Sequence, residues 1–173
     1  VHWGGASPNM MELIKIAKRN NLKVVEDACM GIGAKIKNKR PGTFGDVNAF
    51  SMHPLKSLNV MGDGGMVVTN NDKIASLIKL YRSHGVLEKR YYHIVPGHNF
   101  RITNFQAAMG LAQMKNKKKI FLKRKMIFKN YKKELDNNKF IIQKINSKSD
   151  FVPWTQAIYF KNKKINYKKF HII

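Results

Sequence analysis

The amino-acid sequence predicts an α/β fold with a mainly parallel sheet. Short apolar segments typical of strands alternate along the chain with segments of helical periodicity. Polar residues directly follow two of the predicted strands, and glycine, proline and asparagine mark the turns between elements. Ligands of such sheets bind at the carboxyl ends of the strands, so the polar residues at those ends are the first candidates for a site.

The first part of the chain predicts a helix, a strand and a turning excursion. Ser7 and Pro8 are a helix-start pattern with Ser7 as the N-cap. The apolar face of that helix is expected at Met10, Leu13, Ile14 and Ala17. Residues 22–28 predict a short buried strand that ends in two acids, and residues 33–46 predict a small hairpin or loop.

Two more strands and a helix are predicted next. The strands are residues 47–52 and 65–69, and the helix covers residues 70–85 with Gly85 as its C-cap. The inner face of this helix is expected at Ile74, Leu77, Ile78 and Tyr81. Residues 86–99 have no clear period and contain proline and glycine, which predicts a loop.

The last part of the chain predicts one long helix followed by strands. The helical pattern begins at Thr103 and continues to the Asn137–Asn138 pair, which breaks it. Its narrow packing face is expected at Phe105, Ala108, Met109 and Ala112. Residues 139–145 and 157–161 predict strands of a second unit.

The formal net charge of +23 raises the question of nucleic-acid binding. Of the 33 basic residues, 27 are lysine and only six are arginine, the residue that base-reading proteins use most. The 17 asparagines and 17 isoleucines indicate AT-biased codon usage. We interpret the charge as a solvated surface and expect no nucleic-acid partner, with a non-catalytic basic binding module as the alternative.

Size, apolar runs and cysteine content limit the class of protein further. A chain of 173 residues holds one ordinary domain or part of a larger one, and it begins and ends as an excerpt would. We expect no membrane span, because no apolar run approaches the roughly 18 residues that a spanning helix needs. Cys29 is the single cysteine, which excludes an internal disulfide and favours a cytoplasmic location.

Four residues are candidates for chemistry, and their spacing alone leaves each role open. Lys56 follows a strand and precedes a Gly-Asp-Gly-Gly turn, so it could be an exposed lysine, a phosphate ligand or a nucleophile with a lowered pKa. Asp27 could cap a turn or pair with a protonated ring nitrogen. Ser51 and Asn99 could be ordinary polar residues or hydrogen-bond donors to a phosphate.

Two other kinds of site are not supported. The Gly-Asp-Gly-Gly turn lacks the Gly-Lys-Ser/Thr ending of a P-loop. The six histidines show no metal-ligand spacing with the cysteine or with a carboxylate, so no metal site is predicted.

Five ordered blocks carry a family resemblance: "VHWGG", "LKVVEDACMGIGA", "GTFGDVNAFSMHPLKSLNVMGDGGMVVT", "YRSHG" and "NFRITNFQAAMGLAQM". Together with "VPWTQAIYF" they resemble the DegT/DnrJ/EryC1/StrS family of pyridoxal-phosphate-dependent sugar aminotransferases. The resemblance implies aminotransferase fold type I. It assigns residues 1–136 to part of the large cofactor-binding domain, with its N-terminal portion missing, and residues 137–173 to the beginning of a truncated small C-terminal domain.

The resemblance also implies roles for the candidate residues. Lys56 matches the catalytic lysine that forms the internal aldimine with pyridoxal 5′-phosphate and then moves a proton as general base and acid. Asp27 matches the acid that pairs with the pyridine nitrogen, and Ser51 a hydroxyl that holds the cofactor phosphate. Asn99 matches an asparagine that reaches the phosphate of the neighbouring subunit in a homodimer. Met30 stands where the family usually has a glutamine near the ring oxygen, so that hydrogen bond is not expected.

The reaction implied by the resemblance is amino transfer from glutamate or glutamine to a nucleotide-linked keto-sugar, in amino-sugar biosynthesis for polysaccharide, lipopolysaccharide or secondary metabolites. The alternative on the same scaffold is a cofactor-dependent sugar dehydratase or deoxygenase, some of which have histidine at the lysine position. Lys56 favours the aminotransferase, and His53 is three positions away and does not substitute. Because part of the pocket is expected outside these residues, we expect this stretch alone to bind cofactor weakly and to have little or no turnover.

Overall fold

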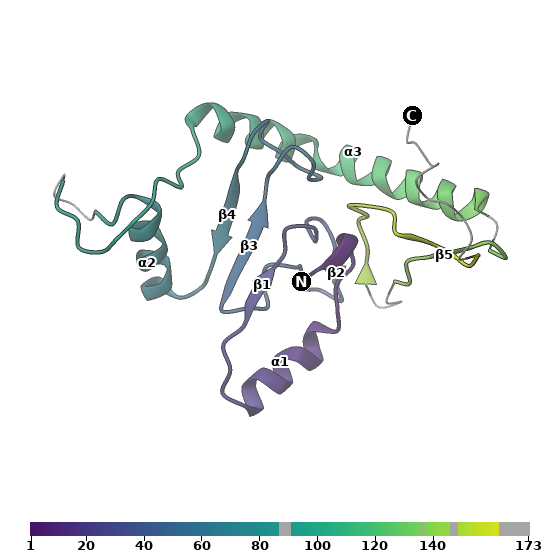
Figure 1. Ribbon diagram of the computed structural model, residues 1–173, viewed down its shortest axis with the longest axis horizontal. Coiled ribbons are helices and arrows are strands. Elements are labelled where there is room, and N and C mark those ends of the chain that lie inside the picture. The colour runs from purple at the N-terminus through teal and green to yellow at the C-terminus, as the bar shows by residue number, and fades with distance from the viewer. Residues whose placement is uncertain (87–90, 136, 146–148, 163–173) are drawn as a thin grey trace.

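The computed structural model describes residues 1–86, 91–135, 137–145 and 149–162. The helices are η1 (Trp3–Gly5), α1 (Met10–Arg19), α2 (Asp72–Arg82) and α3 (Asn104–Glu134). The strands are β1 (Val25–Asp27), β2 (Lys35–Ile36), β3 (Val47–Ser51), β4 (Gly65–Val68), β5 (Phe140–Ile142), β6 (Ser149–Asp150) and β7 (Ile158–Phe160). Figure 1 shows β1, β3 and β4 as a sheet, with α3 running past one end of it and the chain after α3 folding back beside that helix.

The central sheet has the order β1-β3-β4. Strands β1 and β3 are parallel, with Asp27 opposite Ala49, whereas β4 is antiparallel to β3, with Gly65 opposite Ser51. The α/β prediction is confirmed, but among the described strands only one of the two pairings of this sheet is parallel. The reason is the connection between β3 and β4: residues 52–64 contain no helix, and a parallel pair needs a longer crossover.

The start of α1 and the end of α2 differ from the predicted helix ends. Ser7 was the predicted N-cap of the first helix, but the N-cap is Asn9. The hydroxyl of Ser7 is instead buried against the His2 ring, with Oγ 2.8 Å from Nδ1. The C-cap of α2 is Ser83, and Gly85 lies two residues further on, at φ +70°.

The packing faces of the helices were only partly predicted. In α1, Met10 and Ala17 are buried, but Leu13 is 46% exposed. In α2, the buried residue is Leu80, which was not on the predicted face.

The predicted narrow face of α3 is wrong. Phe105 is 70% exposed, and the buried residue is Gly110. A Cβ at Gly110 would lie 3.2 Å from the Met52 side chain and 3.3 Å from that of Val60, so the missing side chain lets α3 approach the segment that follows β3. No helix among the described residues has the length and apolarity needed to cross a membrane.

The chain beyond α3 contacts the chain before it. Both strands predicted after the long helix are present as β5 and β7, which pair antiparallel with the rings of Phe140 and Phe160 5.1 Å apart. Strand β6 pairs with β2, and Phe151 packs edge-on against Phe128 of α3 at 4.9 Å. The predicted domain boundary after residue 136 stays a prediction, and these contacts place residues 149–154 close to the first part of the chain.

Candidate functional site

The carboxyl ends of the parallel strands β1 and β3 bring three predicted site residues to one edge of the sheet. Asp27 is the last residue of β1 and Ser51 the last of β3. The Ser51 hydroxyl accepts a hydrogen bond from the His53 N–H at 3.3 Å, and the Lys56 N–H donates to the His53 carbonyl at 2.8 Å. Ser51 therefore begins the turn that carries Lys56, and the lysine stays next to the strand ends.

Asp27 is held as a carboxylate. Burial raises its pKa, but hydrogen bonds from the Cys29 thiol and the Cys29 backbone N–H bring the pKa below its ordinary value, and the charge of Lys56 makes a smaller contribution in the same direction. The backbone bond is 3.0 Å long and ends on Oδ1. An ionised carboxylate stabilises a protonated ring nitrogen placed beside it, because the two charges are opposite.

The thiol of Cys29 is not a nucleophile: its Sγ donates to the Ala49 carbonyl at 3.7 Å and also faces Asp27. Burial, followed by the hydrogen bond to Asp27 and the charge of that carboxylate, raises the pKa of Cys29 to about 11. A thiol with this pKa stays protonated at neutral pH. Met30, the next residue, is half-buried, and its thioether has no hydrogen to donate.

Trp154 was not predicted as a site residue, and the structure places it against Lys56. The Lys56 Nζ lies 4.4 Å from the centre of the Trp154 ring, within the range of a cation–π contact. The indole N–H donates to the carbonyl of Leu55 at 2.9 Å. The sequence signal was slight: a tryptophan in a resembling block some 100 residues away from the lysine along the chain.

The neighbour of Asp27 has a structural role. Glu26 is 2% exposed, and its Oε1 lies 2.6 Å from Nε2 of His2, which is fully buried. Its carboxylate also accepts from the backbone N–H groups of Gly42, Phe44 and Gly45 at 2.6, 2.9 and 3.1 Å.

These bonds outweigh burial in the titration of Glu26. Burial raises the pKa of Glu26, and the bonds from His2 and the three N–H groups bring it below its ordinary value. Successive side chains of a strand point to opposite faces, so Glu26 anchors the chain on one face while Asp27 is free for the site on the other.

Asn99 lies apart from these residues in this chain. It is exposed, its backbone forms a bridge with Ser83, and its Oδ1 accepts from Arg101 Nε at 3.0 Å. It lines a groove of about 1000 Å³ together with residues of β4 and α2, and neither Asp27 nor Lys56 lines that groove. A contact from Asn99 to the site of a second subunit stays a prediction.

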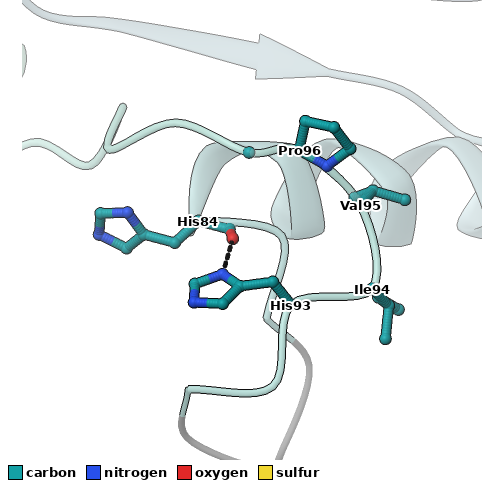
Figure 2. A pocket seen from close by; sticks show the side chains of 6 residues that line it. His84, His93, Ile94, Val95 and Pro96 are labelled. Atoms are coloured by element: carbon teal, nitrogen blue, oxygen red, sulfur yellow. Dashed lines mark hydrogen bonds between the residues drawn. The ribbon is translucent and has the colours of Figure 1, made fainter.

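The loop before Asn99 forms a smaller hollow of about 440 Å³ (Figure 2), lined by His84, His93 and residues 94–97. His93 Nδ1 lies 2.7 Å from the His84 carbonyl, and Figure 2 shows the His84 ring turned away from this bond. In the part of the chain that the structure describes, no group of three or more His, Cys, Asp or Glu side chains is placed to hold a metal ion.

Comparison with known proteins gives one family. A model of the DegT/DnrJ/EryC1/StrS aminotransferase family matches residues 1–173. The UDP-4-amino-4,6-dideoxy-N-acetyl-beta-L-altrosamine transaminase of Campylobacter jejuni strain 81-176 is 36% identical over 143 residues. The matched region is 81% of this chain and 38% of the relative, so the chain spans well under half the length of that protein.

Solved structures confirm the fold. Helicobacter pylori PseC, an aminotransferase involved in the biosynthesis of pseudoaminic acid, superposes with a TM-score of 0.86 at 28% identity, over 98% of this chain and 46% of PseC. NtdA from Bacillus subtilis, determined with bound cofactor PMP, superposes with a TM-score of 0.80 at 29% identity, over 92% of this chain and 37% of NtdA. The chain belongs to the DegT/DnrJ/EryC1/StrS aminotransferase family.

Proposed function

We propose that the protein containing this chain is a pyridoxal-phosphate-dependent aminotransferase that transfers an amino group to a nucleotide-linked keto-sugar. The observation that supports this most is the meeting of an ionised Asp27 and the amine of Lys56 at one sheet edge, in a chain of this family. The relative from Campylobacter jejuni is named as a transaminase of a UDP-linked amino-sugar, which supports the substrate class.

The residues present fit pyridoxal phosphate. Lys56 would supply the amine that holds the cofactor aldehyde, Asp27 a carboxylate for its ring nitrogen, and Ser51 a hydroxyl for its phosphate. The bound cofactor supplies an electron sink. Asp27 would keep the ring nitrogen protonated, because its own pKa is lowered and it remains charged at neutral pH. Lys56, once free, holds and moves a proton at its Nζ as general base and acid.

A homodimer with shared sites is part of the proposal. Asn99 is exposed, its Oδ1 accepts a hydrogen bond from Arg101, and its NH₂ group can donate to a phosphate on another subunit. Glutamate or glutamine is the proposed amino donor, and the cytoplasm the proposed location.

Spectroscopy of the full-length protein tests the proposal. Reconstituted with pyridoxal phosphate, it is expected to develop a visible absorbance band that Lys56→Ala abolishes. With glutamate or glutamine and a nucleotide-linked keto-sugar, the product is expected to be an amino-sugar. Equal absorbance of the wild type and the variant would refute the role of Lys56, and a deoxy-sugar without nitrogen would identify a dehydratase or deoxygenase instead.

A further inference from the structure

We propose that Trp154 is a positioning residue for Lys56: its indole ring receives the Lys56 ammonium whenever the lysine is not joined to the cofactor. The proposal rests on the proposed function, because only a lysine that alternates between a bound and a free state needs a defined place when free. It adds a residue from the chain beyond α3 to a site otherwise formed by residues before α2.

Two contacts connect the indole to the lysine. The ring centre lies 4.4 Å from Lys56 Nζ, and the indole N–H holds the carbonyl of Leu55, the residue before the lysine, at 2.9 Å. The ring face attracts the cation, and the N–H fixes the backbone from which the lysine extends. The same side chain therefore sets both the position of the turn and the position of the amine.

The segment that carries Trp154 is held firmly on the first residues of the chain. The Trp154 N–H donates to the Gly4 carbonyl at 3.0 Å, and Arg124 of α3 donates to the Trp154 carbonyl at 3.1 Å. Val152 is 1% exposed. Gly5, at φ +94°, has no room for a side chain, because a Cβ there would collide with the Val152 carbonyl and lie 2.9 Å from the Trp154 nitrogen.

The contact between Trp154 and Lys56 matters for the site because it lies near Asp27. The charge of Lys56 contributes to the lowered pKa of Asp27, so the amine on the ring is still within electrostatic reach of the carboxylate. A free lysine that carries a proton is a cation, and a ring face stabilises the cation and not the neutral amine. Trp154 thus keeps the proton-bearing lysine beside the strand ends.

The test uses the cofactor-free full-length protein, so its result does not depend on the aminotransferase activity. Reductive methylation with ¹³C-formaldehyde reacts with neutral amines, and peptide mass spectrometry gives the rate at Lys56 relative to that at Lys39. Trp154→Leu removes the ring and is expected to speed the labelling of Lys56 about two- to fivefold, the factor of a cation–π contact at a partly exposed site. Trp154→Phe introduces a side chain of similar size to leucine but keeps an aromatic face. The labelling rate of Lys56 in this variant is expected to stay close to the wild-type rate.

A spectroscopic arm separates this role from simple packing. The ¹³C-methyl resonance of dimethylated Lys56 is expected upfield of the exposed lysines because of the ring current, and it is expected to move to their position in Trp154→Leu. Trp3→Leu, which changes a tryptophan that is 61% exposed, is the control and is expected to change neither result. Equal labelling rates and equal resonances in the Leu and Phe variants would overturn the proposal.

The two proposals fail separately. If Lys56→Ala leaves the cofactor absorbance unchanged, the proposed function is wrong, and the positioning role falls with it. If the absorbance depends on Lys56 but labelling and resonances do not respond to Trp154→Leu, the function stands and the role of Trp154 is overturned.

Discussion

Two regions of this chain carry the residues that its family resemblance singles out, and they are built differently. The strand-end region, with Asp27, Ser51 and Lys56, is fixed by buried neighbours: Glu26 and its four hydrogen bonds on one face of β1, and the docked segment of Trp154 above the lysine turn. The segment that carries Asn99 is exposed, and Asn99 makes its side-chain hydrogen bond to another exposed residue, Arg101.

The difference indicates which of the two regions takes its geometry from contacts within a single subunit. The strand-end region has its partners within the chain, so its geometry follows from folding. The Asn99 segment presents donors to the outside, which is what a residue acting on a second subunit requires. Substitutions in the first region should therefore affect folding or chemistry, and substitutions in the second should affect cofactor affinity alone.

Lys56→Ala is expected to have the largest effect. Loss of the amine removes both the covalent attachment and the proton transfer, and turnover of the full-length protein should fall about 10⁴-fold. Steady-state amino-sugar formation measures this. Lys39→Ala is the matched control, since Lys39 also lies over a ring, that of Phe44 at 5.9 Å, and it should not change turnover.

Glu26→Gln tests whether the strand-end region is held by its buried carboxylate. Each oxygen of the Glu26 carboxylate accepts hydrogen bonds from two donors. In the variant, the amide NH₂ would replace one of these oxygens and would face N–H groups. Leaving a buried donor without its acceptor costs about 1–3 kcal/mol of unfolding free energy, which denaturant titration measures. Asp63→Asn, at a side chain that is 99% exposed, should cost less than about 0.5 kcal/mol. An equally small effect of Glu26→Gln would contradict the structural role.

The same residue predicts sensitivity to acid. The pKa of Glu26 is lowered in the folded protein from 4.5, so its stabilisation is present above pH 4.5 and is lost as the pH falls through the folded pKa. The free energy of unfolding should decline in this acid range more steeply in the wild type than in Glu26→Gln. Parallel pH profiles for the two proteins would count against the network.

Asp27→Asn should have a smaller effect, on chemistry more than on folding. The amide cannot keep a ring nitrogen protonated, and the loss of a hydrogen bond between charged groups predicts turnover lower by about 10- to 100-fold. The Cys29 N–H still has an oxygen to bond, so the unfolding free energy should change little. A variant that unfolds would show that Asp27, like Glu26, is structural.

Asn99→Ala should have the smallest effect of the series. One hydrogen bond to a phosphate predicts cofactor affinity lower by about tenfold, with the fold unchanged because Asn99 is exposed. Mixing Asn99→Ala subunits with Lys56→Ala subunits sharpens the comparison: if Asn99 acts across the dimer, each mixed dimer has one intact site and one site with both changes. If mixing does not raise the cofactor affinity per active site, Asn99 acts in the site of its own subunit.

The sequence predicted which residues lie at the strand ends better than it predicted the packing, and the roles of those residues stay predictions. Asp27, Ser51 and Lys56 could be placed at one edge because strand ends are marked by local residue patterns, and parallel strands bring those ends together. The face of α3 could not be predicted. Phe105 is more apolar than Gly110, but the backbone of Gly110 is what packs on Met52 and Val60.

Contacts between distant parts of the chain account for the other differences. Ser7 has the pattern of a helix cap, but the buried ring of His2 competes successfully for its hydroxyl. Trp154 contacts Lys56 only because β6 pairs with β2 and the chain beyond α3 folds back, and neither partner signals this locally. Sequence patterns report neighbours along the chain, and these contacts depend on tertiary structure.

The central claim is that one lysine, held beside Asp27, carries the cofactor. Borohydride reduction of the full-length protein with bound pyridoxal phosphate, followed by peptide mass spectrometry, tests it most directly. The account predicts one pyridoxyl group per chain, on the peptide that contains Lys56. A pyridoxyl group on another lysine, with Lys56 unmodified, would contradict it.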